Sequence, residues 1–165
     1  MNRLQTFHET LIPMLVSACG AQSYLEFGTH TNETIGRVVC GRRYGVDINP
    51  IRCHGVTMFQ MTTREFIRNH ASLNAPYDFV LIDADHTADA VEDDYNGILP
   101  HVSPEGLICL HDTNPQTELD TQFGLCGNAW EFARDLHDRG AEALTLPYHP
   151  GLTIIRKRIQ WGPAS

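Results

Sequence analysis

The stretch YDFVLIDADH, residues 77–86, decides the fold class of this 165-residue chain. Residues 79–82 (FVLI) form a continuous apolar run, which is typical of a strand buried on both faces of a sheet. Asp83 ends this run, and an acid at such a position must be paired or lie near water at a pocket. The stretch therefore indicates a buried parallel strand whose end faces a site.

Strand and helix patterns alternate on both sides of this stretch. The predicted strands are residues 23–27, 44–48, 56–61, 79–83, 107–110, 143–146 and 152–156. The predicted helices begin near Asn32, after a capping box formed by Thr62 and Glu65, at about residue 88, and at Asn128. Only residues 147–151 join the last two strands, so these two are expected to form an antiparallel hairpin.

This order predicts an α/β fold with a Rossmann-like, doubly wound, seven-stranded sheet that is mostly parallel and ends in an antiparallel hairpin. We expect a single domain over residues 1–165, with a helical segment at 1–21 and the core at 22–158. Pro13 is expected to kink or divide the helical segment. In the helix that begins near Asn32, we expect Ile35, Val38 and Val39 to face inward.

Composition and charge exclude several classes of protein. Hydrophobic residues make up 42% of the chain and charged residues 19%, as in globular proteins. The net charge of −8 disfavours a nucleic-acid partner, and no apolar run approaches the roughly 20 residues of a membrane helix. The five cysteines are widely spaced without a CxxC motif, which favours reduced thiols in a cytoplasmic protein.

The segment LEFGTH, residues 25–30, places an acid and a glycine at the end of the first predicted strand. Gly28 allows close approach of a ligand to the backbone, and Asp47 ends the second strand 19 residues later, a spacing that suits an acid accepting from ribose hydroxyls. A GxGxxG motif is absent, and Asn32 is a stand-in that tolerates left-handed backbone. Taken singly, a turn glycine and a strand-end acid remain open as alternatives; their joint position favours binding.

The ordered segments LEFGTH, GVDIN, MTTREF, YDFVLIDADH and GLICLHDT resemble the class I S-adenosylmethionine-dependent methyltransferases. More narrowly, they resemble the branch of small O-methyltransferases that act on catechols, caffeoyl thioesters and sugars. The resemblance implies that Glu26 and Gly28 line the methionine part of the cofactor, that Asp47 binds the ribose, and that Asp83 lies near the amino group or the reacting centre. It places Met61 and Thr62 beside the adenine. The same predicted cofactor site includes Thr29, His30 and Ile48.

The ends of the fourth and fifth strands carry the candidate catalytic residues Asp83, His86 and His111. In one mechanism, Asp83 and Asp112 bind Mg²⁺ or another divalent cation, which lowers the pKa of the acceptor hydroxyls. The resemblance implies a third, amide ligand after the second acid, but Thr113 occupies that position. In the other mechanism no metal is present, and His86 or His111 acts as the general base.

We therefore expect methyl transfer from S-adenosylmethionine to a hydroxyl of a small molecule. The alternative is a degenerate, non-catalytic cofactor-binding or interaction module with the same fold; a nicotinamide-dependent oxidoreductase is disfavoured by the missing GxGxxG and the terminal hairpin. The loop at 113–127, with Phe123, Gly124 and Gly127, is expected to cover the substrate. A homodimer is the expected assembly, without nucleic-acid or membrane partners.

Overall fold

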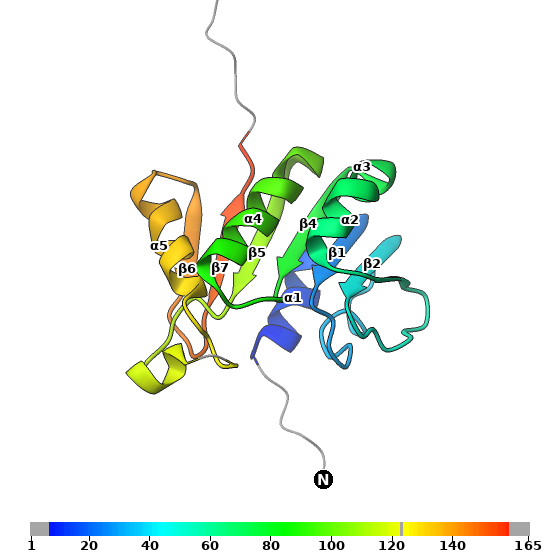
Figure 1. Ribbon diagram of the computed structural model, residues 1–165. Helices are drawn as coiled ribbons and strands as arrows, with labels where there is room; N and C mark the ends of the chain where they lie inside the picture. Colours follow the sequence, from blue (N-terminus) through cyan, green and yellow to red (C-terminus); the bar gives the residue numbers. More distant parts are fainter. Residues whose placement is uncertain (1–6, 123, 159–165) are drawn as a thin grey trace, which may run out of the picture.

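The computed structural model describes residues 7–122 and 124–158 of the chain. Seven strands form one sheet in the order β3-β2-β1-β4-β5-β7-β6 (Figure 1). Their bounds are β1 Ser23–Phe27, β2 Arg42–Asp47, β3 Thr57–Gln60, β4 Tyr77–Ile82, β5 Val102–His111, β6 Ala143–Leu146 and β7 Leu152–Arg156. The first five strands are parallel, and β7 is antiparallel to both β5 and β6. The predicted fold class, including the terminal hairpin, is confirmed.

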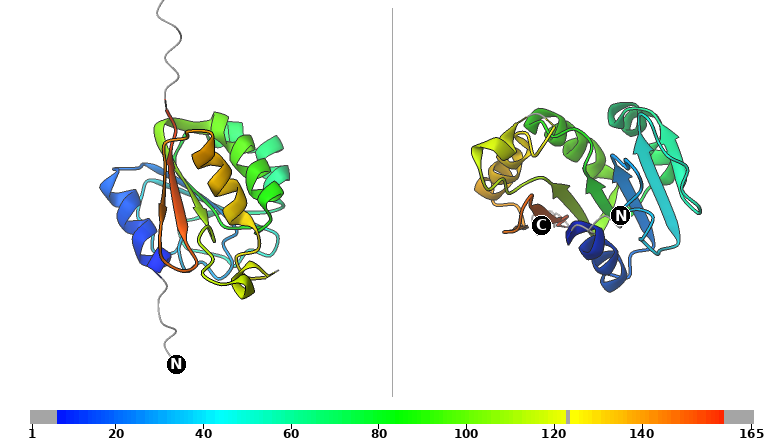
Figure 2. Two further views of the ribbon diagram at one scale, coloured as in Figure 1. Left: turned by 90° about the vertical axis from the view of Figure 1, so that its left-hand side faces the viewer. Right: turned by 90° about the horizontal axis from the view of Figure 1, so that it is seen from below.

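Helices cover the two faces of the sheet unequally. Those in the described residues are α1 Phe7–Ala18, α2 Thr63–Asn69, α3 Ala71–Asn74, α4 Ala88–Ile98 and α5 Ala129–Asp138, with short 3-10 turns η1 Leu99–His101 and η2 Glu118–Thr121. Figure 2 shows α1 on one face of the sheet and α4 and α5 on the other. One hydrophobic core cluster lies on the side of the sheet that carries α2, α4 and α5. A second lies beneath α1, where Ile12 and Val16 are buried. None of the helices in the described ranges is long and apolar enough to cross a membrane.

The register brings the carboxyl ends of β1, β2 and β4 to one edge of the sheet. Phe27, the last residue of β1, is paired with Val46 on one side and Ile82 on the other. Beyond the strands, the Gly28 N–H donates to the Val46 carbonyl, and the Asp83 N–H donates to the Phe27 carbonyl, both at 2.9 Å. Gly28, Asp47 and Asp83 therefore leave the sheet side by side.

The helix predicted near Asn32 does not form. Isolated turns occupy residues 30–37, with hydrogen bonds from Gly36 N to Asn32 O (3.0 Å) and from Arg37 N to Thr34 O (2.9 Å). Asn32 has φ 65°, in the left-handed region that it was expected to tolerate, and this region cannot continue into a right-handed helix. Gly36 lowers the helix propensity of the same segment further. Ile35 and Val38 are buried as expected.

Three smaller predictions also need correction. Val39 is 86% exposed, because the helix that was expected to point its side chain inward does not form. The α1 helix runs through Pro13, so of the two expected outcomes there the division is wrong, and the kink stays a prediction. Asn128 precedes α5, but its side chain does not cap that helix; it accepts a hydrogen bond from the Ala88 N–H at 2.9 Å. That bond ties the start of α4 to the start of α5.

The capping box at the start of α2 is confirmed. The Glu65 N–H donates to the Thr62 hydroxyl oxygen at 3.2 Å, and the Thr62 N–H donates to the Glu65 carboxylate at 3.0 Å. Because β3 ends at Gln60, Met61 and Thr62 form the short link between this strand and α2. The capping box therefore fixes this link at the edge of the sheet where Asp47 ends β2.

Candidate functional site

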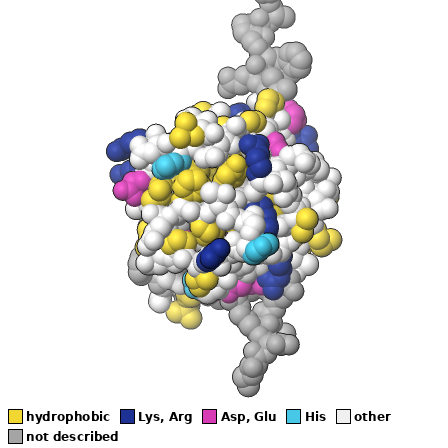
Figure 3. Space-filling view, turned by 90° about the vertical axis from the view of Figure 1, so that its right-hand side faces the viewer, with side chains coloured by type: hydrophobic (Ala, Val, Ile, Leu, Met, Phe, Trp, Pro, Cys, Tyr) yellow, Lys and Arg dark blue, Asp and Glu magenta, His cyan; other side chains and the backbone are white. Residues whose placement is uncertain are grey.

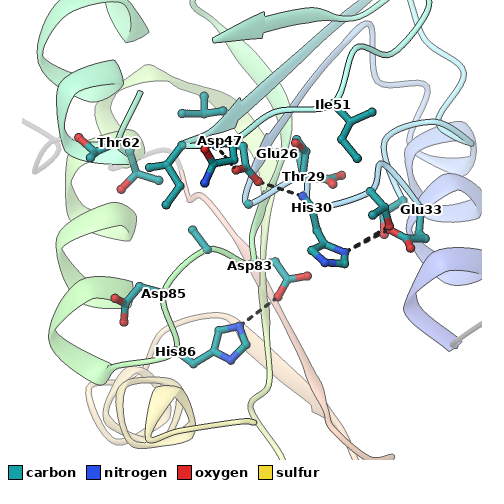
Figure 4. A pocket seen from close by; sticks show the side chains of 18 of the residues that line it. Glu26, Thr29, His30, Glu33, Asp47, Ile51, Thr62, Asp83, Asp85 and His86 are labelled. Atoms are coloured by element: carbon teal, nitrogen blue, oxygen red, sulfur yellow. Dashed lines mark hydrogen bonds and ion pairs between the residues drawn. The ribbon is translucent and has the colours of Figure 1, made fainter. Parts of the chain in front are cut away.

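A cavity of about 980 Å³ opens at the carboxyl ends of β1, β2 and β4 (Figure 4). Its walls include all nine residues of the predicted cofactor site, namely Glu26, Gly28, Thr29, His30, Asp47, Ile48, Met61, Thr62 and Asp83. His86 lines the same cavity, whereas His111 and Asp112 do not and are largely buried behind it. The structure thus gathers the predicted cofactor residues around one space and places two of the predicted chemical residues just outside it.

Asp47 is held at its end of the cavity by backbone groups. One carboxylate oxygen accepts from the His30 N–H at 2.9 Å, and the other accepts from the Asn49 N–H at 2.8 Å. Figure 4 shows Asp47 beside the His30 backbone and facing the cavity. Each carboxylate oxygen has two lone pairs, so these bonds orient Asp47 and leave it able to accept from a ligand.

Gly28 is required by the arrangement of the strands. Its φ is 80°, and a Cβ at this position would lie 2.0 Å from the Asp83 carbonyl oxygen. A larger residue would therefore push the ends of β1 and β4 apart. The sequence suggested close approach of a ligand as the reason for this glycine, and the structure adds contact between two strand ends.

Glu26 and Thr29 supply polar groups on the buried side of the cavity. Glu26 is only 2% exposed, and the Tyr24 hydroxyl donates to its carboxyl group. Burial raises the pKa of Glu26 to about 8, although the Tyr24 hydrogen bond opposes this rise. The Thr29 hydroxyl is buried and has no hydrogen-bond partner in the part of the chain that the structure describes. A bound ligand with a polar group would satisfy it.

At the other end of the cavity, two carboxylates and two imidazoles form a compact cluster. His111 Nδ1 lies 3.1 Å from both Asp83 Oδ1 and Asp112 Oδ2. His86 Nε2 lies 3.2 Å from Asp112 Oδ2 and 3.7 Å from Asp83 Oδ1. One donor atom from each of Asp83, His86 and Asp112 lies within 4.8 Å of the other two, which is close enough for a shared metal ion. We call these four residues the carboxylate–imidazole cluster.

Attraction between opposite charges determines how the pKa values of the two buried cluster residues, His111 and Asp112, are shifted. Burial alone would lower the pKa of His111, but the Asp83 and Asp112 carboxylates outweigh it and raise that pKa to about 10. Burial would likewise raise the pKa of Asp112, but the hydrogen bond and charge of His111 hold it below its ordinary value. The two carboxylates therefore favour the protonated form of His111.

The loop predicted as a cover, residues 113–127, is attached to His86. His86 Nδ1 is hydrogen-bonded to the Leu125 carbonyl oxygen, and the Asn128 N–H donates to the His86 carbonyl at 3.0 Å. Gly124 lines the cavity. Phe123, which was expected to contribute to this cover, lies outside the described residues.

Sequence reasoning missed His8 at the start of α1. His8 lines the cavity, and its ring packs edge-on against His111 with the ring centroids 4.1 Å apart. Burial lowers the pKa of His8, and the positive charge of His111 lowers it further. No local motif could have signalled this residue, because only the packing of α1 against the sheet brings it to the strand ends.

Comparison of this chain with known proteins agrees with this geometry. A family model described as a methyltransferase domain matches residues 21–113, which is more than half of the chain. The chain therefore belongs to this family of methyltransferase domains, as predicted. A search of curated proteins found no match to the sequence.

Solved structures show the same fold at low sequence identity. Cofactor-bound Rv0187 from MTB is similar with a TM-score of 0.73 and 13% identity, over 96% of this chain and 83% of that one. The O-methyltransferase TomG from Streptomyces achromogenes, involved in tomaymycin synthesis and solved with S-adenosylmethionine, has a TM-score of 0.66 and 16% identity, over 91% and 79%. MycE, a methyltransferase of the mycinamycin pathway solved with Mg and S-adenosylhomocysteine, has a TM-score of 0.62 and 20% identity, over 87% of this chain but 47% of MycE.

Proposed function

We propose that this chain transfers the methyl group of S-adenosylmethionine to a hydroxyl of a small molecule. The observation that carries the proposal is the cavity in which Gly28 and Asp47, at the ends of adjacent strands, share the walls with Asp83 and His86 of the carboxylate–imidazole cluster. Membership of the methyltransferase domain family and the cofactors named for TomG and MycE support it.

The residues at the Gly28 end fit an adenosyl amino acid. Asp47 is oriented to accept from two ribose hydroxyls, and the Thr29 hydroxyl lacks a partner that a ligand would supply. Glu26 lies next to Gly28 on the buried side, where its carboxylate form would pair with the methionine ammonium group. Met61 would lie against the adenine and Ile48 beside the ribose.

The acceptor hydroxyl would lie at the exposed half of the carboxylate–imidazole cluster. Methyl transfer is a displacement at carbon, so the protein must align the hydroxyl oxygen with the methyl group and accept its proton. Asp83 and His86 line the cavity and can touch the acceptor. Without a metal ion, this pair would accept the proton; with a divalent cation bound at the cluster, the cation would instead lower the pKa of the acceptor hydroxyl.

His111 is proposed as a positioning residue. It is largely buried, does not line the cavity, and has a pKa that Asp83 and Asp112 raise to about 10. A general base must be free to accept a proton near the working pH, so His111 is poorly suited to that role. Its two contacts instead fix where the carboxylates point.

Calorimetric titration with S-adenosylmethionine and S-adenosylhomocysteine tests the cofactor assignment. We expect micromolar binding with one ligand per chain, followed by transfer of a labelled methyl group to at least one member of a hydroxyl-acceptor panel. Absence of binding heat, together with absence of competition by S-adenosylhomocysteine, would overturn the proposal. Binding without turnover on any acceptor would favour the non-catalytic alternative.

Partners and location follow from charge and thiol chemistry. We propose a small-molecule acceptor and no nucleic-acid partner, since the net charge is −8 and basic side chains are scattered among other types on the face seen in Figure 3. All five cysteines are free, which supports a reducing compartment such as the cytoplasm. Phe7 and Met14 on the outer side of α1 are more than half exposed, which supports a homodimer. Light scattering of the purified protein tests the last point.

A further inference from the structure

We propose that His86 is a metal ligand which, together with Asp83 and Asp112, makes this site prefer a first-row transition-metal ion over Mg²⁺. The inference deepens the proposed function, because the ion would lie where the acceptor hydroxyl binds. It concerns a residue in this chain that takes the place of the amide ligand implied by the family resemblance, at whose position Thr113 stands.

The first step concerns the tautomer of the His86 ring, which its contact with Leu125 fixes. A neutral imidazole has one nitrogen that donates and one that accepts. The hydrogen bond with the Leu125 carbonyl oxygen uses Nδ1, and a carbonyl can only accept, so Nδ1 carries the hydrogen. In the neutral ring, the lone pair then belongs to Nε2, which is the nitrogen that faces the cluster.

The second step concerns what this lone pair meets. Nε2 faces Asp112 Oδ2 at 3.2 Å and Asp83 Oδ1 at 3.7 Å, and both oxygens are acceptors. His111 compensates the charge of the two carboxylates, but the lone pair of a neutral Nε2 still faces two acceptor oxygens unless a proton or a metal cation lies between them. A divalent ion satisfies all three together, and the 4.8 Å limit on their separations suits a shared ligand shell.

The surroundings of His86 are those of a metal ligand. Histidines that bind metals almost always donate their other ring N–H to a carboxylate, a backbone carbonyl or water, which fixes the ring. The Leu125 carbonyl serves this purpose for His86. The carboxylates are fixed in turn by His111 Nδ1, at 3.1 Å from each. Because Asp83 and His86 also line the cavity, the ion would keep open positions for an acceptor.

The donor types decide the class of ion. Mg²⁺ prefers oxygen ligands, whereas imidazole nitrogen suits transition-metal ions such as Fe²⁺, Co²⁺ and Zn²⁺. Two carboxylate oxygens and one imidazole nitrogen, with open positions, therefore favour a transition-metal ion. With an amide oxygen in place of His86 this preference would be weaker.

The test uses the full chain without S-adenosylmethionine, so that its outcome does not depend on methyl transfer. Co²⁺ and Mg²⁺ are titrated separately by calorimetry, and Co²⁺ is also followed by its visible absorption. We expect one Co²⁺ per chain at this site, bound at least roughly tenfold more tightly than Mg²⁺. His86→Gln should weaken Co²⁺ binding about tenfold or more and leave Mg²⁺ binding much less affected. His54→Gln, a change at an exposed histidine outside the cavity, is the matched control.

Equal affinity for Co²⁺ and Mg²⁺ in the unmodified chain would overturn the proposal, and so would an absorption spectrum dominated by thiolate ligation. Equal losses in His86→Gln and His54→Gln would overturn it as well. The comparison of the two ions needs no variant, so it remains decisive if His86→Gln folds poorly. Failure of S-adenosylmethionine to bind in a separate titration would count against the proposed function alone.

Discussion

At the end of β2, one carboxylate is held by two backbone N–H groups, whereas at the ends of β4 and β5 two carboxylates are held by two imidazole rings. Asp47 is therefore oriented by the path of the chain itself. Asp83 and Asp112 are oriented by side-chain contacts, chiefly with His111, whose pKa they raise. The first arrangement can bind a neutral polar group such as a ribose, and the second is adapted to protons and cations.

In the proposed function, this difference separates cofactor binding from the chemical step within one cavity. Changes at the Asp47 end should alter the affinity for the cofactor and leave the chemical step almost intact. Changes in the carboxylate–imidazole cluster should do the reverse. The four predictions that follow test this separation, beginning with the largest expected effect.

Asp112→Asn should lower kcat on the order of 100-fold or more. A bound cation stabilises the charge of the transition state by several kcal/mol, and each 1.4 kcal/mol is about a factor of ten in rate. The Kd for S-adenosylmethionine should change less than about threefold, because Asp112 does not line the cavity. Steady-state kinetics and calorimetry measure the two quantities. Asp89→Asn, at the exposed start of α4, is the control. A matching loss of cofactor affinity in Asp112→Asn would contradict the separation.

Asp47→Ala should raise the Kd for S-adenosylmethionine by about 10-fold to 100-fold, since a hydrogen bond to a charged group is worth roughly 1.5–3 kcal/mol. At saturating cofactor, kcat should remain close to that of the unmodified chain. Calorimetry gives the affinity, and Asp138→Asn at the exposed end of α5 serves as control. Unchanged affinity would mean that Asp47 does not contact the ribose.

Glu26→Gln should abolish a proton release that accompanies cofactor binding. With a pKa of about 8, Glu26 is mostly protonated at pH 7, and pairing with the methionine ammonium requires its carboxylate form. Binding to the unmodified chain should therefore release close to one proton, and affinity should rise between pH 6 and 7.5. Calorimetry in two buffers of different ionisation enthalpy measures the release. If the unmodified chain releases none, Glu26 does not meet the ammonium group as a carboxylate.

Thr62→Ala should lower the free energy of unfolding by about 1 kcal/mol, the usual cost of losing an N-cap side chain. Its hydroxyl already serves the capping box, so the Kd for S-adenosylmethionine should change less than about threefold. Urea denaturation and calorimetry measure the two effects, with Thr57→Ala on β3 as control. A tenfold loss of affinity would show that the Thr62 side chain contacts the cofactor directly.

The fold could be predicted wherever a local pattern repeats. A few neighbouring residues suffice in two places: the apolar run at 79–82 predicts a buried strand, and the capping box of Thr62 and Glu65 predicts the start of a helix. The segment after Gly28 misled the prediction because Ile35 and Val38 have helical spacing and are indeed buried, although only turns form. Burial at two positions three residues apart does not require a helix when left-handed Asn32 precedes them.

The candidate site divides in the same way. The sequence alone could predict that Gly28, Asp47 and Asp83 lie close together, because the ends of neighbouring parallel strands share one edge of the sheet. The position of His8 could not be predicted, since nothing in its neighbours reveals where α1 packs. The tautomer of His86 depends on the Leu125 carbonyl, 39 residues away, and the charge of His111 depends on two side chains that only folding places beside it. Such properties arise from long-range contacts and leave no spacing signal.

The most direct measurement is a crystal structure of the chain with S-adenosylhomocysteine. We predict that the ribose hydroxyls lie within hydrogen-bond distance of the Asp47 carboxylate, with the amino-acid part passing over Gly28 towards Glu26. A ligand bound elsewhere, or one whose ribose points away from Asp47, would contradict the account.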